Sequence, residues 1–159
     1  MGAARFMEQQ KKTYRTFHFD NMVVWNSAFC GTLSTPGHAP VAVGNPPAFK
    51  GTPDVWCPEN FLTGALNACL MLTFLYQTQL RKLGVVACES SAQGTLERKD
   101  GKYRVTEITV LPHITLKCEQ DLAPAGDVIK ETVDLCMISN SILATVRLEP
   151  QLETHSASP

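Results

Sequence analysis

The sequence predicts one α+β domain with the element order β-β-β-α-β-β-α-β, in which antiparallel sheets surround a long buried central helix. An aromatic and β-branched segment opens the chain, a helix-length apolar run occupies its middle, and two strand-like segments around a short turn follow. The 159 residues have the size of a single domain, residues 1–159 with an ordered core at about 14–149, and 44% of them are apolar.

The N-terminal third predicts a three-stranded antiparallel meander. Its first strand is expected within Tyr14–Trp25, which is rich in aromatic and β-branched residues. A turn at Asn26-Ser27 leads to a second strand near Phe29–Leu33, and a turn at Thr35-Pro36-Gly37 leads to a third at Ala39–Val43.

The central helix is predicted to begin at Pro58 and to run to about Leu83. The preceding segment, Gly44–Pro53, is a loop because its prolines and glycines disfavour regular pairing. Proline suits a first helical turn, Glu59 favours the positive end of the helix dipole, and Gly84 is expected to end the helix. Its middle turns are apolar nearly all the way round, so we expect burial on most sides.

The second half predicts a hairpin, a helix and a final strand. The hairpin strands are Val85–Leu96 and Tyr103–Lys117, joined at Lys99-Asp100-Gly101. The helix is expected at about Gly126–Met137 and the last strand at Ile142–Leu148. The residues that follow are expected to fray.

Composition disfavours several classes of function. The net charge is −1, and no basic stripe marks a surface for nucleic acid. The apolar run Phe61–Tyr76 is shorter than the roughly 20 residues of a membrane span. Met1–Gln10 lacks the apolar segment of a secretory signal, so we expect a cytoplasmic protein without nucleic-acid or membrane partners. Charged residues are only 18%, which is compatible with an oligomer.

The cysteines and histidines do not form a metal-binding pattern. No C-x-x-C pair occurs, and the four histidines are scattered, so neither a zinc site nor a secreted disulfide framework is expected. A buried cysteine is usually a small apolar side chain, and we keep this interpretation for Cys30, Cys57, Cys88 and Cys118, which lie on predicted strands or loops. Without their sequence context, Cys69 and Cys136 would also be interpreted as small apolar side chains.

Three segments nevertheless form an ordered pattern. They are Cys57-Pro58-Glu59-Asn60-Phe61-Leu62, then Ala65-Leu66-Asn67-Ala68-Cys69, then Cys136-Met137-Ile138-Ser139-Asn140-Ser141-Ile142. A Pro-Glu pair opens the central helix, a cysteine follows ten residues after the Glu, and a second cysteine ends the second helix before a Ser-Asn turn. From Tyr14 to Glu149 the chain thereby resembles the OsmC/Ohr family, the osmotically inducible and organic hydroperoxide resistance proteins.

The resemblance implies an intertwined homodimer with sites at the subunit interface and the activity of a thiol peroxidase. It assigns Cys69 as the thiolate that a hydroperoxide oxidises to a sulfenic acid, Cys136 as the resolving cysteine that forms a disulfide with it, and Glu59 as an orienting carboxylate. It implies a dithiol reductant and no metal or organic cofactor. The family arginine that pairs with the glutamate has no match, because no Arg occurs between Thr16 and Leu80.

The residues themselves set two further expectations. In the middle of an apolar helix, burial should raise the pKa of Cys69. Glu59 and Cys69 are ten residues apart, about 15 Å along one straight helix, so they can share a site only across a dimer or through an irregular first turn. Glu59 is equally what a first helical turn favours without any catalytic role.

Three functions remain open at this stage. The leading one is reduction of organic hydroperoxides, with apolar neighbours favouring lipid-like or aromatic substrates over hydrogen peroxide; these neighbours are Phe61, Leu62, Leu66 and Leu72. The second is a non-catalytic protein of the same fold that binds a small apolar ligand or senses oxidants. The third is a structural dimer module with six inert cysteines.

Overall fold

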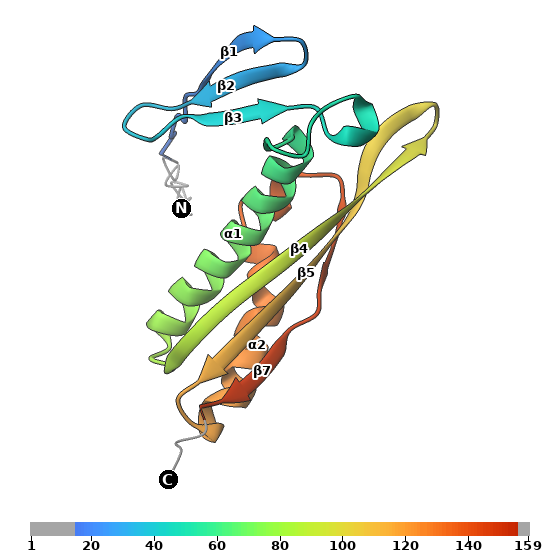
Figure 1. The fold of residues 1–159 in the computed structure, drawn as a ribbon. Coiled ribbons are helices and arrows are strands. Elements are labelled where there is room, and N and C mark those ends of the chain that lie inside the picture. The colour runs from blue at the N-terminus through green and yellow to red at the C-terminus, as the bar shows by residue number, and fades with distance from the viewer. Residues whose placement is uncertain (1–14, 156–159) are drawn as a thin grey trace, which may run out of the picture.

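The computed structural model describes residues 15–155 and confirms the α+β class. Figure 1 shows a small N-terminal sheet at one end of a long helix and a larger sheet alongside that helix. The strands are β1 Met22–Ser27, β2 Cys30–Ser34, β3 Val41–Gly44, β4 Val85–Lys99, β5 Lys102–Leu116, β6 Thr145–Leu148 and β7 Gln151–Thr154. The α-helices are α1 Pro58–Leu80 and α2 Leu122–Leu135, and the short 3-10 helices are Pro47–Phe49, Glu119–Asp121 and Ser139–Ser141.

The N-terminal sheet confirms the predicted antiparallel meander, in the order β1-β2-β3. Its first strand begins at Met22, later than the sequence suggests, and Tyr14 lies outside the described residues. The turn after β1 is closed by Ala28, whose φ is 45°, and the Trp25 indole donates a hydrogen bond to its carbonyl at 3.0 Å. Every residue of β1 is exposed.

Helix α1 begins at Pro58, as predicted, because the residue before it completes a cap. The Asn60 side-chain oxygen accepts hydrogen bonds from the Cys57 backbone N–H at 3.2 Å and from the Cys57 thiol at 2.9 Å, and the Asn60 backbone N–H donates to the Cys57 carbonyl at 3.0 Å. The helix ends at Leu80, earlier than expected. The left-handed residue that ends it is Lys82, with φ 58°, rather than the glycine predicted to stop it.

The second sheet is mixed, which corrects the prediction of purely antiparallel sheets. β4 and β5 form a long antiparallel hairpin whose turn residues Asp100 and Gly101 both have positive φ, at 52° and 79°. β6 and β7 each pair with β5 in parallel. The residues after β6 were expected to fray, but Gln151–Thr154 forms the ordered edge strand β7, which corrects that expectation.

Helix α2 begins and ends earlier than predicted, and β6, the strand expected at Ile142–Leu148, begins later. Pro124 lies within the first turn of α2, where a missing N–H is tolerated. Cys136 follows the helix with ψ 119°, an extended conformation that turns the chain away. This break places Cys136 at the junction between α2 and the turn before β6.

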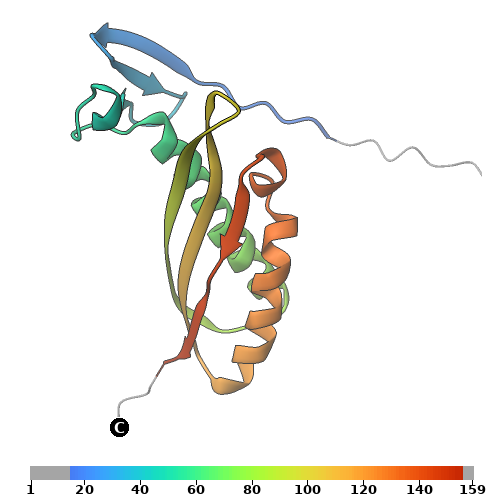
Figure 2. The ribbon, with the colours of Figure 1, turned by 90° about the vertical axis from the view of Figure 1, so that its right-hand side faces the viewer.

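Both helices pack on the same face of the larger sheet (Figure 2). The buried residues of α1 follow one line at a spacing of four: Leu66, Leu70, Phe74 and Thr78. They contact inward residues of β5 and the apolar face of α2 in two clusters.

The opposite face of α1 is exposed, so the single chain does not provide the burial on most sides that the sequence predicts. Leu72, Tyr76 and Leu80 are 61%, 58% and 60% exposed. Within residues 15–155, α1 is the one helix long and apolar enough to cross a bilayer. Its packing against α2 and the sheet is consistent with a core helix.

Candidate functional site

The fold brings Cys69 and Cys136 together. Cys69 lies near the middle of α1, one residue before the buried Leu70, and Cys136 follows the last turn of α2. Both belong to one apolar cluster with Leu66 and Ile108, in which Cys136 is fully buried and Cys69 is partly exposed. The helix cysteine is therefore the more accessible member of the pair.

Polar groups of α1 and of the turn after α2 lower the pKa of Cys69. Burial acts to raise its pKa, but the thiol of Cys136, the backbone N–H groups of Ile138 and Met137, and the hydroxyl of Thr73 all stabilise the thiolate, so the pKa of Cys69 is lowered. This corrects the expectation that apolar surroundings would raise it. Thr73 lies four residues after Cys69, on the same side of α1.

Cys136 is shifted in the opposite direction. Burial raises the pKa of the Cys136 thiol, and its hydrogen bond to Cys69 and the charge of that sulfur raise it further. The Ser139 N–H lies 3.4 Å from the Cys136 sulfur and partly offsets this effect. Cys69 is thus the more readily ionised thiol of the pair, and Cys136 is the less readily ionised one.

The turn after α2 is held by its own hydrogen bonds, as the Ser-Asn sequence predicts. The Asn140 N–H donates to the Cys136 carbonyl at 3.1 Å, and the Ser141 N–H donates to the Ile138 carbonyl at 3.0 Å. The Asn140 side chain also donates to the Asp134 carbonyl at 2.7 Å, and the Ser141 hydroxyl donates to the Met137 carbonyl at 2.7 Å. These bonds fix the backbone beside the two sulfurs.

Glu59 lies in the first turn of α1, apart from the two cysteines. Its Oε2 atom is buried, yet no residue within 15–155 gives it a hydrogen bond. It is not among the groups that hydrogen-bond to Cys69 or act on its charge. A buried carboxylate oxygen without a donor is costly, so this position favours a donor from beyond residues 15–155, such as water.

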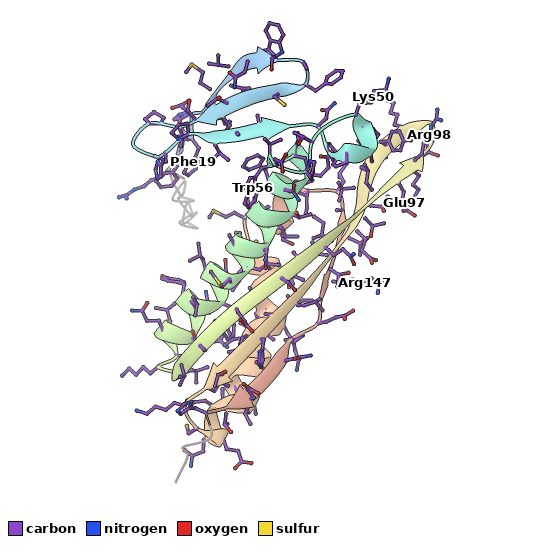
Figure 3. All side chains as sticks on the ribbon, in the orientation of Figure 1. Phe19, Lys50, Trp56, Glu97, Arg98 and Arg147 are labelled. Atoms are coloured by element: carbon purple, nitrogen blue, oxygen red, sulfur yellow. The ribbon has the colours of Figure 1, made fainter. Side chains whose placement is uncertain are left out.

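Two aromatic residues, Trp56 and Phe61, flank Glu59 in the sequence. Trp56 lies at the start of α1, beneath the N-terminal sheet (Figure 3), and is 54% exposed. Its ring stacks at a tilt on that of Phe61, with 5.5 Å between the centroids.

The other four cysteines lie in separate places, and all six are free thiols. Cys57 caps α1, as described above, and burial raises the pKa of the Cys88 thiol. Cys30 lies at the start of β2, and Cys118 is exposed after β5. Across residues 15–155, no cluster of three or more His, Cys, Asp or Glu side chains has an arrangement suited to a metal ion.

An open cleft borders the cysteine cluster and was not visible in the sequence. Its volume is about 630 Å³, and it is shared by α1, the tip of the β4–β5 hairpin and the segment before β6. Leu62 and Ile142 line it and also pack against the cluster that contains both cysteines. Arg104 and Lys99 lie on its wall.

The sequence named both cysteines and the glutamate as candidates, and the structure brings only the two cysteines together; the sequence did not indicate the groups that act on the Cys69 sulfur. Helical spacing alone places Thr73 near Cys69, so a search at four-residue intervals would have found it. The N–H groups of Met137 and Ile138 carry no sequence signal, because any residue other than proline supplies them.

A family model described as OsmC-like protein matches residues 51–151, which include the whole of the site. A comparison with proteins of curated function finds no match.

Solved structures share the fold at low sequence identity. An OsmC-like protein of unknown function from Vibrio cholerae is 19% identical, with a TM-score of 0.79 over 86% of this chain and 100% of its own. An OsmC-like protein from Mycoplasma pneumoniae is 16% identical, with a TM-score of 0.73 over 89% and 100%. The organic hydroperoxide resistance protein OhrB of Bacillus subtilis is 17% identical, with a TM-score of 0.60 over 86% and 98%.

Proposed function

This chain belongs to the OsmC-like protein family, and on that premise we propose that it is a cytoplasmic thiol-dependent peroxidase that reduces organic hydroperoxides. The observation that carries the proposal is the cysteine pair. Cys69 has a lowered pKa and partial exposure, whereas its hydrogen-bonded neighbour Cys136 has a raised pKa and is buried. A peroxidatic and a resolving thiol require this asymmetry.

The first step is oxidation of Cys69. Its thiolate attacks the terminal oxygen of the hydroperoxide, the S–O bond forms as the O–O bond breaks, and the alcohol leaves after taking up a proton. The organic hydroperoxide is reduced by two electrons, and Cys69 becomes a sulfenic acid. The leaving alkoxide takes its proton from solvent water, and Cys136 enters only in the next step.

The second step forms the disulfide. Cys136 attacks the Cys69 sulfenic sulfur, the S–S bond forms, and water leaves with the hydroxyl of the sulfenic acid and the thiol proton. A dithiol reductant then restores both thiols and is itself oxidised to a disulfide. No metal or organic cofactor takes part in this sequence.

We further propose that the working unit is a homodimer in which Glu59 is an orienting carboxylate. The exposed face of α1 and the exposed N-terminal sheet support an interface with a second copy. The buried Oε2 of Glu59 lacks a donor within residues 15–155. A group of the partner or the hydroxyl of the hydroperoxide would satisfy it.

The apolar surroundings favour an organic over an inorganic peroxide. Leu62 and Ile142 connect the cysteine cluster with the open cleft, which gives an apolar substituent a place beside the reacting sulfur. Cumene hydroperoxide should therefore oxidise Cys69 faster than hydrogen peroxide does. Equal rates would contradict this substrate class.

The test is to treat the reduced protein with one equivalent of cumene hydroperoxide, count the remaining thiols and map any disulfide by mass spectrometry. We expect rapid loss of two thiols per chain and a Cys69–Cys136 bond. Cys136→Ser should stop at the sulfenic acid, and Cys69→Ser should leave all thiols intact. Cys118→Ser is the matched control, because this exposed cysteine lies outside the site and its loss should change nothing.

Turnover separates the peroxidase from a sensor or ligand-binding protein. With excess dithiol, a peroxidase consumes many equivalents of hydroperoxide, whereas a sensor forms the disulfide once and regenerates slowly. No thiol loss over minutes would contradict both redox functions.

A further inference from the structure

We propose that Asn67 is a positioning residue: together with Ser90 it fixes the rotation of α1 about its own axis, so that Cys69 faces Cys136. The inference rests on the proposed peroxidase function, in which these two cysteines must form a disulfide. It assigns a task to the polar side chain that interrupts the apolar middle of the helix.

Asn67 and Ser90 hydrogen-bond to each other in both directions. The Asn67 amide donates to the Ser90 backbone carbonyl at 3.0 Å, and the Ser90 hydroxyl donates to the Asn67 side-chain oxygen at 2.5 Å. Pro112 stands opposite Ser90 on β5 and has no backbone N–H to offer this carbonyl. The neighbours of Ser90 on the inward side of β4, Cys88 and Ala92, pack against the two apolar clusters, so the polar link lies within an apolar layer. Both bonded partners belong to one chain, and the link therefore needs no second copy.

The bonded Asn67 and the reactive Cys69 lie on opposite sides of the buried line of α1. Leu66 and Leu70 mark that line. Asn67 comes directly after the first of them and Cys69 directly before the second, and successive helical residues are about 100° apart around the axis. One side of the line is therefore tied to β4, and the other packs beside Cys136 after α2. A rotation that breaks the bonds of Asn67 also changes how Cys69 meets Cys136.

Apolar packing alone does not select this rotation sharply. The apolar surface of α1 extends beyond its buried line, since Leu72 and Tyr76 are exposed. The gain from burying an apolar side chain has no direction, whereas a hydrogen bond depends strongly on its angle. The hydroxyls of Thr63 and Thr78 bond to carbonyls of α1 itself and so do not tie the helix to the sheet. The polar link to β4 supplies the missing direction.

Three variants separate the link from general packing. Asn67→Leu deletes both bonds at similar volume. Ser90→Ala deletes the hydroxyl and leaves the bond from the amide to the backbone carbonyl. Thr78→Val is the matched control, because it deletes a buried hydroxyl of the same helix whose bond goes to the Leu75 carbonyl and not to the sheet.

The measurement is the equilibrium of the Cys69–Cys136 disulfide with glutathione, quantified on the linked peptides by mass spectrometry. Oxidised glutathione takes two electrons and two protons from the thiols and becomes two molecules of reduced glutathione, as the S–S bond forms between the cysteines. A variant that destabilises both oxidation states equally leaves this equilibrium constant unchanged, whereas a change in the geometry of the pair alters it. We expect the constant to fall about tenfold in Asn67→Leu and about threefold in Ser90→Ala, and to stay within about twofold in Thr78→Val.

An unchanged constant in folded Asn67→Leu overturns the proposal, and so does an equal fall in Thr78→Val. Circular dichroism establishes folding, and should Asn67→Leu fail to fold, Ser90→Ala decides the matter. The result is separable from the peroxidase hypothesis, because oxidation by glutathione needs no hydroperoxide. A disulfide that glutathione forms and cumene hydroperoxide does not, with the expected fall in Asn67→Leu, would support the positioning role and contradict the peroxidase. No Cys69–Cys136 disulfide with either oxidant would contradict both.

Discussion

The N-terminal sheet and the body formed by α1, α2 and β4–β7 differ in what covers their apolar side chains. In the body, inward residues of β5 such as Ile108 and Leu116 are fully buried under both helices. In the N-terminal sheet, Trp25 and Met22 are 74% and 61% exposed. The body has its own core, whereas the sheet presents an apolar surface of the kind that marks an interface.

The two regions also contribute different parts of the site. The body alone assembles Cys69 and Cys136. The first turn of α1, which carries Glu59, lies where the N-terminal sheet attaches through the bridge between Val43 and Trp56. The thiol pair is therefore assembled within the body of one chain, whereas the carboxylate lies where the body meets the N-terminal sheet.

The largest effect on stability is expected when a side chain is truncated in the body, and the same kind of truncation in the N-terminal sheet provides the comparison. Leu66→Ala should destabilise the chain by about 2–5 kcal/mol, because Leu66 is fully buried between the helix and the sheet. Val24→Ala in β1 should cost less than about 0.5 kcal/mol in a dilute monomer, because this side chain is exposed. Urea unfolding measures the loss of unfolding free energy in each variant. Equal losses would contradict the distinction between the body and the N-terminal sheet.

A smaller effect should show how closely the body is packed. A Cβ on Gly94 of β4 would lie 2.5 Å from the Cγ2 methyl of Thr63 on α1, so Gly94→Ala should cost about 1–3 kcal/mol. Adding Thr63→Ser removes that methyl and keeps the hydroxyl, and the double variant should recover most of the loss. A double-mutant cycle of unfolding free energies without coupling would contradict this contact.

The exposed sheet makes a prediction about assembly. Trp25→Ala should weaken self-association by about tenfold or more, since a tryptophan buried at an interface contributes strongly to binding. Leu111→Ala, on the outer face of β5, is the control and should leave association unchanged. Sedimentation velocity across a concentration series measures both. A monomer at all concentrations would contradict the proposed dimer.

The smallest predicted effect is the pH-dependent stabilisation of the edge strand β7. The carboxylates of Glu89 and Glu153 raise the pKa of His113, whose ring nitrogens lie 3.4 and 3.2 Å from them. The stabilisation is fully present below the unfolded pKa of about 6.5 and is lost as pH rises through the folded pKa. His113→Gln should therefore lower Tm at acidic pH and leave it unchanged at alkaline pH; a pH-independent difference would refute the linkage.

The sequence predicted elements with local signals and missed those that depend on distant partners. Pro58 located the start of α1 because proline is tolerated only there, and Asp100-Gly101 located the hairpin turn. β7 was missed because its four residues form a strand only by pairing with β5. The family pattern identified Cys69, but the donors that lower its pKa come from a backbone turn distant in the sequence.

The position of β5 between its neighbours has a consequence for the order of folding. β5 pairs with β4 across a two-residue turn. Its other edge pairs with β6 and β7, in which each residue lies 38 positions after its partner in β5. Short loops close faster than long ones, so we expect the hairpin to form early and the second edge late. Because Cys136 lies on that late connection, we expect Cys69 to reach its place in the helix before Cys136 packs beside it.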